Sequence, residues 1–164
     1  MDNYIVINGK KAELTEKQLI ALGIETKNND PFKLRETEYY WINGLGAVLS
    51  DFYSNGCGVS EDRHNVANFC TDKKIMEQRA LHETLNRLLW RYSMRHDGDK
   101  IDWHDANSSK FKIYYNTYEN SLNIDGNQFY VAEGAVYFYT KEIAVAAIKE
   151  IVNPFMEEHP DFKW

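Results

Sequence analysis

The stretch Ala135–Phe155, AVYFYTKEIAVAAIKEIVNPF, contains in one run the two kinds of element from which the fold is built. In its first part Val136 and Phe138 alternate with tyrosines, which predicts a strand with one apolar face. Thr140 follows as an N-cap residue. Apolar residues then recur every three or four positions, which predicts a helix that packs by one face. These residues are Ala144, Ala147, Ile148, Ile151, Val152 and Phe155.

The same order of strand, threonine and helix occurs earlier in the chain. There Phe69 and Thr71 occupy the places of Phe138 and Thr140, so we expect an edge strand over Val66–Cys70 and a long helix after it. The residues predicted on the buried side of that helix are Leu81, Leu85, Leu88, Leu89 and Tyr92.

A smaller unit with two strands and a helix is predicted near the start of the chain. Tyr4–Ile7 and Lys11–Leu14 flank Asn8-Gly9, a dipeptide preferred in tight hairpin turns. Thr15 and Gln18 then have the spacing of a capping box. This pattern predicts a ββα unit.

Composition and turn signals divide the chain into five segments. Residues 1–26 form the N-terminal ββα unit, 27–37 a polar linker, 38–94 a strand–strand–helix unit, 95–110 an acidic connector, and 111–164 a unit of three strands and a helix. We therefore expect an α+β fold of antiparallel hairpins and a meander, with repeated ββα units and two long helices packed on the sheet. The units are expected to pack as one domain.

Finer expectations follow for the two larger units. Strand Glu38–Ile42 should turn at Asn43-Gly44 into a return strand, and Ser54–Asn65 should be a polar loop. The last three strands should form a meander in which each pairs with the next; they are Phe111–Tyr118, Leu122–Val131 and Val136–Tyr139. Pro154 should kink or end the last helix near Asn153. The polar tail Glu157–Trp164 should be frayed, unless Trp164 docks.

Charge and cysteine content limit the function classes. The net charge is −6, with 25 acidic and 19 basic residues, which disfavours sequence-independent binding to nucleic acid. Cys57 and Cys70 form no CxxC pair and have no metal-ligand spacing, so we expect two reduced thiols. The start lacks the features of a signal peptide, and no apolar run approaches the roughly 18 residues of a membrane span. We therefore expect a cytoplasmic protein that is not associated with a membrane.

The connector contains the densest group of chemically active side chains. His96 and His104 lie among the carboxylates of Asp97, Asp99, Asp102 and Asp105. One interpretation is a metal site or an acid–base pair. The other is a turn-rich loop whose aspartates accept backbone N–H groups, and it is favoured because no residue elsewhere completes a catalytic constellation. We assign no catalytic, cofactor-binding or metal-binding residue.

Aromatic residues provide the candidates for partner binding. Trp103 is either a plug that pins the connector to the core or an exposed anchor. If alternate residues of strand Phe111–Tyr118 face the helix, Tyr114 and Tyr118 face outward beside Tyr137 and Tyr139. Such an aromatic face is either covered by another element or used for binding.

The order of features over Glu38–Phe155 also supports a comparison with a known group. A tyrosine-rich strand and a polar loop precede Asn68–Thr71 and a long helix; the connector with Asp102 and Trp103 and a final strand and helix follow. Together with the opening Leu14–Gln18, this order resembles small uncharacterised accessory proteins encoded by bacteriophages and prophages. The resemblance implies a phage origin and carries over no catalytic residue.

Two classes of binding function and one of catalysis remain open. The first is a non-enzymatic inhibitor of a host defence protein, most specifically an anti-CRISPR-like inhibitor of a CRISPR effector or its guide-RNA complex, with aspartates meeting a basic groove. The second is a sponge that stacks a nucleotide immune signal on its tyrosines. The third is a metal-dependent enzyme that uses the His/Asp connector. Homodimerisation through an uncovered sheet is also considered.

Overall fold

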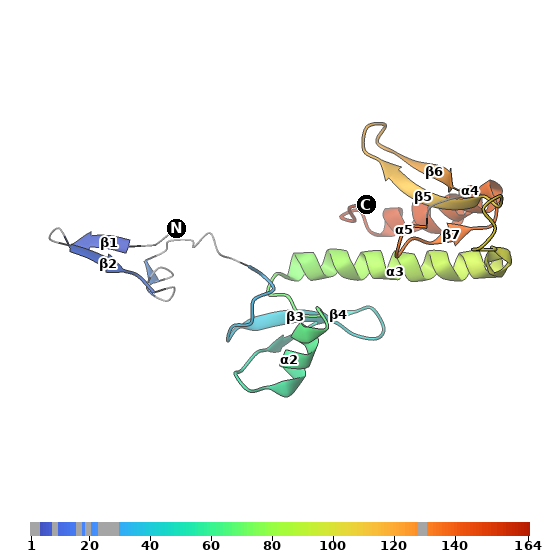
Figure 1. Cartoon of the computed structure of the whole chain (residues 1–164). Helices are drawn as coiled ribbons and strands as arrows, with labels where there is room; N and C mark the ends of the chain where they lie inside the picture. The colour runs from blue at the N-terminus through green and yellow to red at the C-terminus, as the bar shows by residue number, and fades with distance from the viewer. Residues whose placement is uncertain (1–3, 8–9, 16–17, 19–20, 23–29, 128–130) are drawn as a thin grey trace. The chain divides into compact units, whose positions relative to one another are not determined.

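The computed structural model describes residues 4–7, 10–15, 18, 21–22, 30–127 and 131–164. The chain divides into two compact units, Met1–Lys33 and Leu34–Trp164, and each is considered by itself. Helices and antiparallel strands together confirm the α+β class (Figure 1). The repetition of ββα units is not confirmed.

The first unit contains a two-stranded hairpin. Strands β1 (Tyr4–Ile7) and β2 (Lys10–Glu13) pair antiparallel. The backbone N–H of Thr15 donates to Oε1 of Gln18 at 2.9 Å, which confirms one half of the predicted capping box. The predicted turn at Asn8-Gly9 lies outside the described residues.

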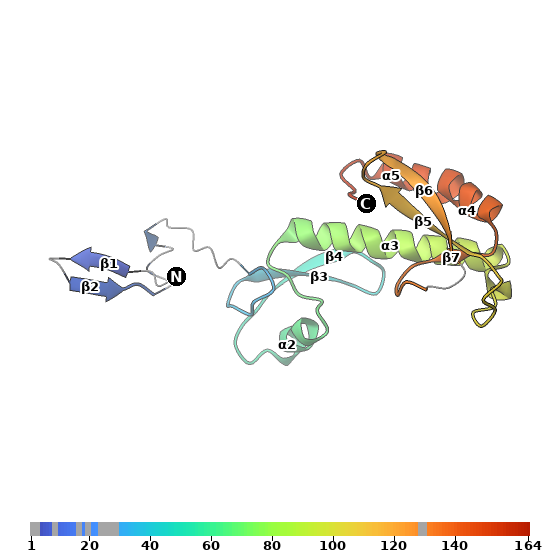
Figure 2. The ribbon, with the colours of Figure 1, turned by 45° about the horizontal axis from the view of Figure 1, so that its top comes forward.

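In the second unit, hairpin β3–β4 lies between two helices (Figures 1 and 2). Strand β3 spans Glu38–Ile42 and β4 spans Val48–Phe52. Ile42 packs toward the long helix with Met76 and Ala80, whereas Tyr39 packs on the opposite face of the hairpin with Tyr53 and Phe69. Alternate residues of one strand thus enter two different cores.

Two predictions for this part of the chain were wrong. Helix α2 (Gly58–Asn65) occupies most of the predicted loop Ser54–Asn65. The predicted edge strand Val66–Cys70 is reduced to one bridge between Tyr40 and Cys70. The reason is that the Asn68 carboxamide takes over the pairing: it accepts from the backbone N–H of Ile42 and donates to its carbonyl, both at 2.8 Å.

Helix α3 (Lys73–Arg95) is the long helix of this unit. At 1.5 Å per residue its 23 residues span about 34 Å. Its N-cap is Asp72, not the predicted Thr71, because Oδ1 of Asp72 accepts from the backbone N–H of Lys74 at 2.9 Å. A carboxylate at this position also interacts favourably with the helix dipole.

The C-terminal sheet has the strand order β6-β5-β7, so the predicted meander was wrong. Strands β5 (Lys110–Asn116) and β6 (Ser121–Asn127) form a hairpin, and the short β7 (Tyr137–Phe138) pairs with the other edge of β5. This arrangement places Phe138 directly opposite Phe111, on the face that packs against the helices. Pairing of two core-facing aromatic residues favours this order.

A nearly continuous helical segment follows β7. Thr140 caps α4 (Lys141–Ala147), as predicted, by accepting from the backbone N–H of Ile143 at 3.3 Å. The segment continues as the π-helical turn η2 (Ile148–Val152) and α5 (Asn153–Glu158). Pro154 therefore does not end the helix. Because proline has no N–H to donate, the backbone hydrogen bonds just before it change from the i→i+4 pattern of an α-helix to the i→i+5 pattern of a π-helix.

The main core lies between α3, the C-terminal sheet and this helical segment. Its buried residues are Leu85, Leu89, Tyr92, Phe138, Ala144, Ala147, Val152, Phe155 and Phe162. Both predicted apolar stripes contribute to it, although Leu81, Leu88 and Ile151 are only partly buried.

The C-terminal tail is docked, contrary to the expectation that it is frayed. The Phe162 side chain is only 8% exposed and packs edge-on against Phe155. On α3 the Gln78 carboxamide donates to the carbonyl of Asp161 at 2.7 Å and accepts from the N–H of Lys163 at 3.0 Å. An amide group that holds two backbone groups fixes the residue between them.

Candidate functional site

The predicted connector crosses one end of the outer face of the C-terminal sheet. Its short helix η1 (Gly98–Lys100) follows α3, and Ile101 is buried. The Trp103 ring packs edge-on against Tyr137, with centroids 5.5 Å apart, yet 49% of the residue remains exposed. Trp103 thus has features of both interpretations: one edge fixes the connector and the rest of the ring is accessible.

Lys110, the first residue of β5, connects the sheet to the connector by hydrogen bonds. The residue is 1% exposed, and its Nζ donates to the carbonyls of Asp105 and Ser108, each at 3.0 Å. A buried ammonium group is tolerated only where such acceptors replace its water. These two hydrogen bonds therefore fix the backbone of the connector at Asp105 and Ser108.

The aspartates of the connector make local contacts. Asp102 accepts from the N–H of His104, and Asp105 accepts from the N–H of Asn107, both at 2.8 Å. Asp97 forms a 3.0 Å ion pair with Lys100, and its carboxylate raises the pKa of that lysine. These contacts agree with the turn interpretation.

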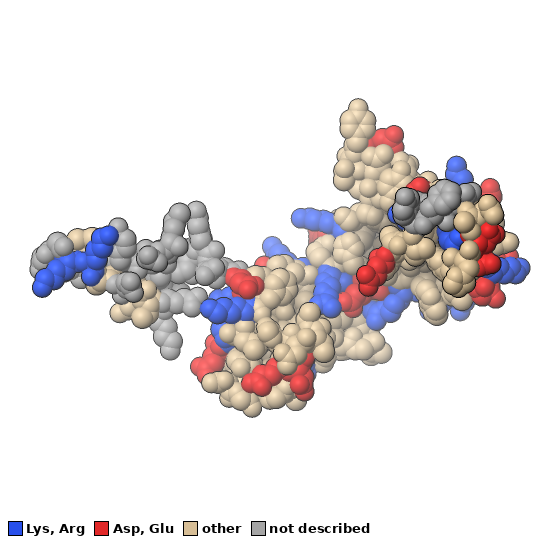
Figure 3. Space-filling view, in the orientation of Figure 1, with Lys and Arg blue, Asp and Glu red and all other residues tan. Residues whose placement is uncertain are grey.

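The carboxylates nevertheless remain available to a partner. Asp97, Asp99 and Asp102 are exposed, and Asp105 is partly buried. Figure 3 shows acidic and basic groups interspersed over the end of the unit where α3 ends. Acceptance of a backbone hydrogen bond does not remove the negative charge, so these groups can still attract a cationic surface.

The predicted outward row of tyrosines is only partly present. Tyr137 is 4% exposed, so its assignment as a partner contact was wrong: Trp103 covers its ring, and its hydroxyl accepts from the N–H of Ala132. Tyr114 and Tyr139 are each 38% exposed. Tyr118 is 96% exposed in the turn between β5 and β6.

A group of exposed residues remains around the connector, and we name it the connector surface. Lys100 interacts electrostatically with Asp97, Asp99 and Tyr139, which places these residues together. Trp103 joins them through its ring contact with Tyr137, which lies two residues before Tyr139 in the chain. The connector surface consists of Asp97, Asp99, Asp102, Trp103 and Tyr139.

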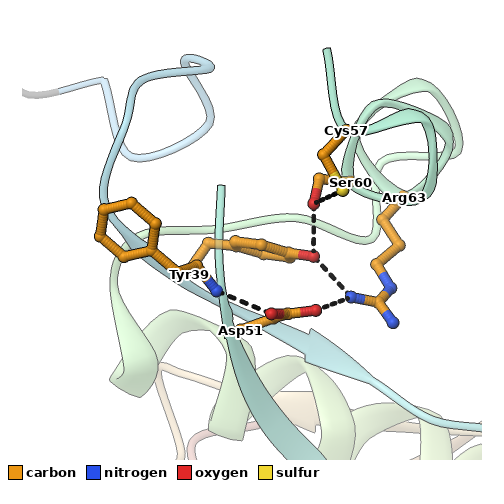
Figure 4. A network of polar contacts seen from close by, with 6 residues as sticks. Tyr39, Asp51, Cys57, Ser60 and Arg63 are labelled. Atoms are coloured by element: carbon orange, nitrogen blue, oxygen red, sulfur yellow. Dashed lines mark hydrogen bonds and ion pairs between the residues drawn. The ribbon is translucent and has the colours of Figure 1, made fainter. Parts of the chain in front are cut away.

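Sequence reasoning missed a polar network between β3–β4 and α2, shown in Figure 4. Arg63 donates to the hydroxyl of Tyr39 at 2.5 Å and to the carboxylate of Asp51 at 2.9 Å. The Tyr39 hydroxyl lies 3.0 Å from Oγ of Ser60, and Ser60 donates to the sulfur of Cys57 at 3.4 Å. Tyr39 and Ser60 are both fully buried.

The direction of these hydrogen bonds follows from the donors. A guanidinium group can only donate, so the oxygen of Tyr39 accepts from Arg63; between Tyr39 and Ser60 either hydroxyl can be the donor. The hydroxyl proton of Ser60 is then directed at Cys57. Together with backbone N–H groups at the start of α2, this donor lowers the pKa of the Cys57 thiol.

The signal for this network in the sequence is spacing. Cys57, Ser60 and Arg63 recur every third residue, which places them on one face of a helix. The segment has almost no apolar stripe, and Gly56 and Gly58 are typical of turns, so the pattern as a whole predicts a loop and not a helix.

Three cavities of the second unit involve other residues. One of about 210 Å³ lies beside Phe138 and Phe162, and one of about 560 Å³ lies beside Lys73 and Pro160. The third, of about 270 Å³, lies beside Tyr92. Within the described part of the chain, no group of three or more His, Cys, Asp or Glu residues is arranged to hold a metal ion.

No family model, curated protein or solved structure matches this chain. Among the residues that the structure describes, no helix has the length and apolar character needed to cross a lipid bilayer.

Proposed function

We propose that the protein acts by binding a basic protein surface through the connector surface. The observation that supports this most is Trp103: the residue is 49% exposed while its ring packs edge-on against Tyr137. A ring that is already fixed loses little conformational entropy on binding, which is one reason that tryptophan is common at binding hot spots.

Charge specifies the partner further. Asp97, Asp99 and Asp102 lie in the connector surface and the whole chain carries a net charge of −6. Carboxylates around an aromatic anchor favour a cationic partner surface and accelerate encounter with it. Grooves that bind nucleic acid have this basic character.

The specific proposal is a phage accessory protein that inhibits a host defence protein in the bacterial cytoplasm. Its partner would be a CRISPR effector nuclease or the guide-RNA complex of that nuclease. The resemblance to phage accessory proteins supports this choice, together with the complementarity between an acidic surface and a groove built for nucleic acid. Inhibition would be steric, because an occupied groove cannot accept its nucleic acid.

The test measures DNA cleavage by purified CRISPR effectors loaded with guide RNA, with and without the protein. We expect inhibition that saturates at a fixed stoichiometry and weakens as salt rises. Trp103→Ala should weaken binding by about thirtyfold, the usual effect of losing a hot-spot tryptophan. A triple change of Asp97, Asp99 and Asp102 to asparagine should mainly slow association.

The matched control is Trp90→Ala, since Trp90 is 60% exposed on α3 and lies outside the connector surface. It should inhibit as the unchanged protein does. Full cleavage activity in the presence of excess protein would argue against a CRISPR effector as the partner. An equal loss of binding in the Trp90 and Trp103 variants would argue against the connector surface.

A further inference from the structure

A basic pocket lies on the side of α3 that packs against η2. Arg91, Arg95 and His96 line this cavity of about 270 Å³ near the end of α3, and Leu88 and Ile151 form its apolar part. This volume is many times the roughly 10–15 Å³ that a cavity needs to hold one water molecule. The pocket is therefore large enough for a small anion and a short organic group.

The two arginines are arranged to act together. Arg91 and Arg95 are four residues apart, so their side chains lie on one face of α3. Within the described part of the chain neither forms an ion pair, whereas Arg63 pairs with Asp51 and Arg79 with Glu83. Two guanidinium groups in one cavity, neither of them in an ion pair, can donate several hydrogen bonds to one oxyanion.

The orientation of His96 is fixed by its neighbour. The His96 ring stacks on Tyr92 with centroids 4.1 Å apart, and its Nδ1 lies 2.8 Å from the carbonyl of Tyr92. A carbonyl oxygen only accepts, so Nδ1 carries the proton. The other ring nitrogen, Nε2, can accept from a phosphate hydroxyl group, or donate to a phosphate oxygen when the imidazole is protonated.

The carboxylate of Glu150 also lines the pocket, and its single negative charge is smaller than the combined positive charge of Arg91 and Arg95. Glu150 accepts a hydrogen bond from the Tyr92 hydroxyl; burial and then this carboxylate raise the pKa of Tyr92. One negative charge faces two guanidinium groups, which leaves the pocket cationic in an otherwise acidic chain. The dipole at the end of α3 also opposes an anion, but less than one charge-assisted hydrogen bond favours it.

We propose that this pocket binds a phosphate group, either as inorganic phosphate or as the terminal phosphomonoester of a small organic phosphate. Arg91 and Arg95 would hold the oxygens, and His96 would contribute a further contact. The alternative is that the arginines only stabilise the helix C-terminus, in which case no saturable binding occurs.

The experiment titrates the full chain with inorganic phosphate, at constant ionic strength, and follows backbone and arginine side-chain signals by NMR. We expect saturable shifts at Arg91, Arg95 and His96 below about 20 mM phosphate, the range of a weak specific site. Adenosine monophosphate forms the second arm. Tighter binding than that of phosphate indicates an organic phosphate, and equal or weaker binding indicates the free anion.

The decisive variant is the double change Arg91→Gln and Arg95→Gln, which should weaken binding about tenfold or more because charge-assisted hydrogen bonds are lost. The control is the double change Lys74→Gln and Lys163→Gln, which removes the same charge from exposed sites outside the pocket and should leave binding within about twofold. Both variants replace exposed side chains, so the fold is retained. Absence of saturation, or an equal loss in the control, would overturn the proposal.

Discussion

Ser60 connects a charged group to a sulfur atom through two hydroxyl groups. Arg63 donates to the Tyr39 hydroxyl and Ser60 donates to the sulfur of Cys57, and the hydroxyl groups of Tyr39 and Ser60 lie 3.0 Å apart between them. Hydrogen bonds in such a chain polarise one another, and the last acceptor gains most when it is negative. The network thus stabilises the Cys57 thiolate while it fills a buried site between the hairpin and α2.

Alkylation of Cys57 measures this effect. The pKa of the thiol is lowered, first by the Ser60 hydroxyl, so the thiolate persists at lower pH than in an ordinary cysteine. The midpoint of the rate of iodoacetamide alkylation against pH should therefore lie below that of Cys57 in the urea-unfolded protein. Ser60→Ala removes the donor and should move this midpoint upward. The readout is mass spectrometry of the Cys57 peptide.

Cys70 serves as the internal control for this measurement, since it is fully buried and should react slowly throughout. A Cys57 midpoint in the folded protein that is no lower than in the unfolded protein would contradict the assignment. So would a midpoint that Ser60→Ala leaves in place.

At the scale of single residues, the sequence indicated which side chains are candidates for partner contact better than it indicated how exposed each one is. For Trp103 the sequence allows both a plug and an exposed anchor, and the structure has features of both; Asp97, Asp99 and Asp102 are exposed, as turn chemistry favours. The burial of Tyr137 could not be predicted, because it depends on where the connector crosses the sheet. The network around Tyr39 depends in the same way on a tertiary contact between β3 and α2.

Among the elements, local capping rules worked where the cap residue had no competitor. Thr140 caps α4 as predicted, whereas Asp72 rather than Thr71 caps α3, since adjacent residues both had suitable side chains. The positions of most strands were also predicted from alternation, with the exception of Val66–Cys70. Their pairing was not: β7 joins the far edge of β5, a choice set by core packing and not by local sequence.

Substitution at Thr140 tests the contribution of the cap. Thr140→Ala removes the acceptor for the N–H of Ile143 and should lower the free energy of unfolding by about 1 kcal/mol. Thr140→Ser keeps the hydroxyl group and should cost less than half as much. Urea unfolding followed by circular dichroism gives both values. Equal losses in the two variants would show that the methyl group, not the cap, is responsible.

On the scale of the whole second unit, α3 supports both sheets. Met76 and Ala80 pack against the β3–β4 hairpin, whereas Leu85, Leu89 and Tyr92 belong to the C-terminal core. The sequence predicted α3 and the part of its buried face that joins the C-terminal core, but not the burial of Met76 and Ala80. It could not show that the docked tail completes the same core, because the tail looks polar apart from its aromatic residues.

The tail provides a test at this scale. Phe162→Ala removes a buried ring from the main core and should lower the free energy of unfolding by about 3 kcal/mol. Trp164→Ala is the control: Trp164 contacts Phe162 edge-on but is 38% exposed, so a loss below about 1 kcal/mol is expected. Guanidinium unfolding of both variants gives the comparison. If the two losses were equal, Phe162 would not be the anchor of the tail.

A helix shared by two cores has a consequence for how the protein accumulates mutations. Met76 and Leu89 are separated by about 20 Å along the axis of α3, a distance at which substitutions ordinarily act independently. Here both residues help to keep the same helix folded. A substitution at either end therefore lowers the free energy of unfolding that remains to offset a substitution at the other end. Sequence change near the hairpin is therefore tolerated only as far as the C-terminal packing can compensate for it.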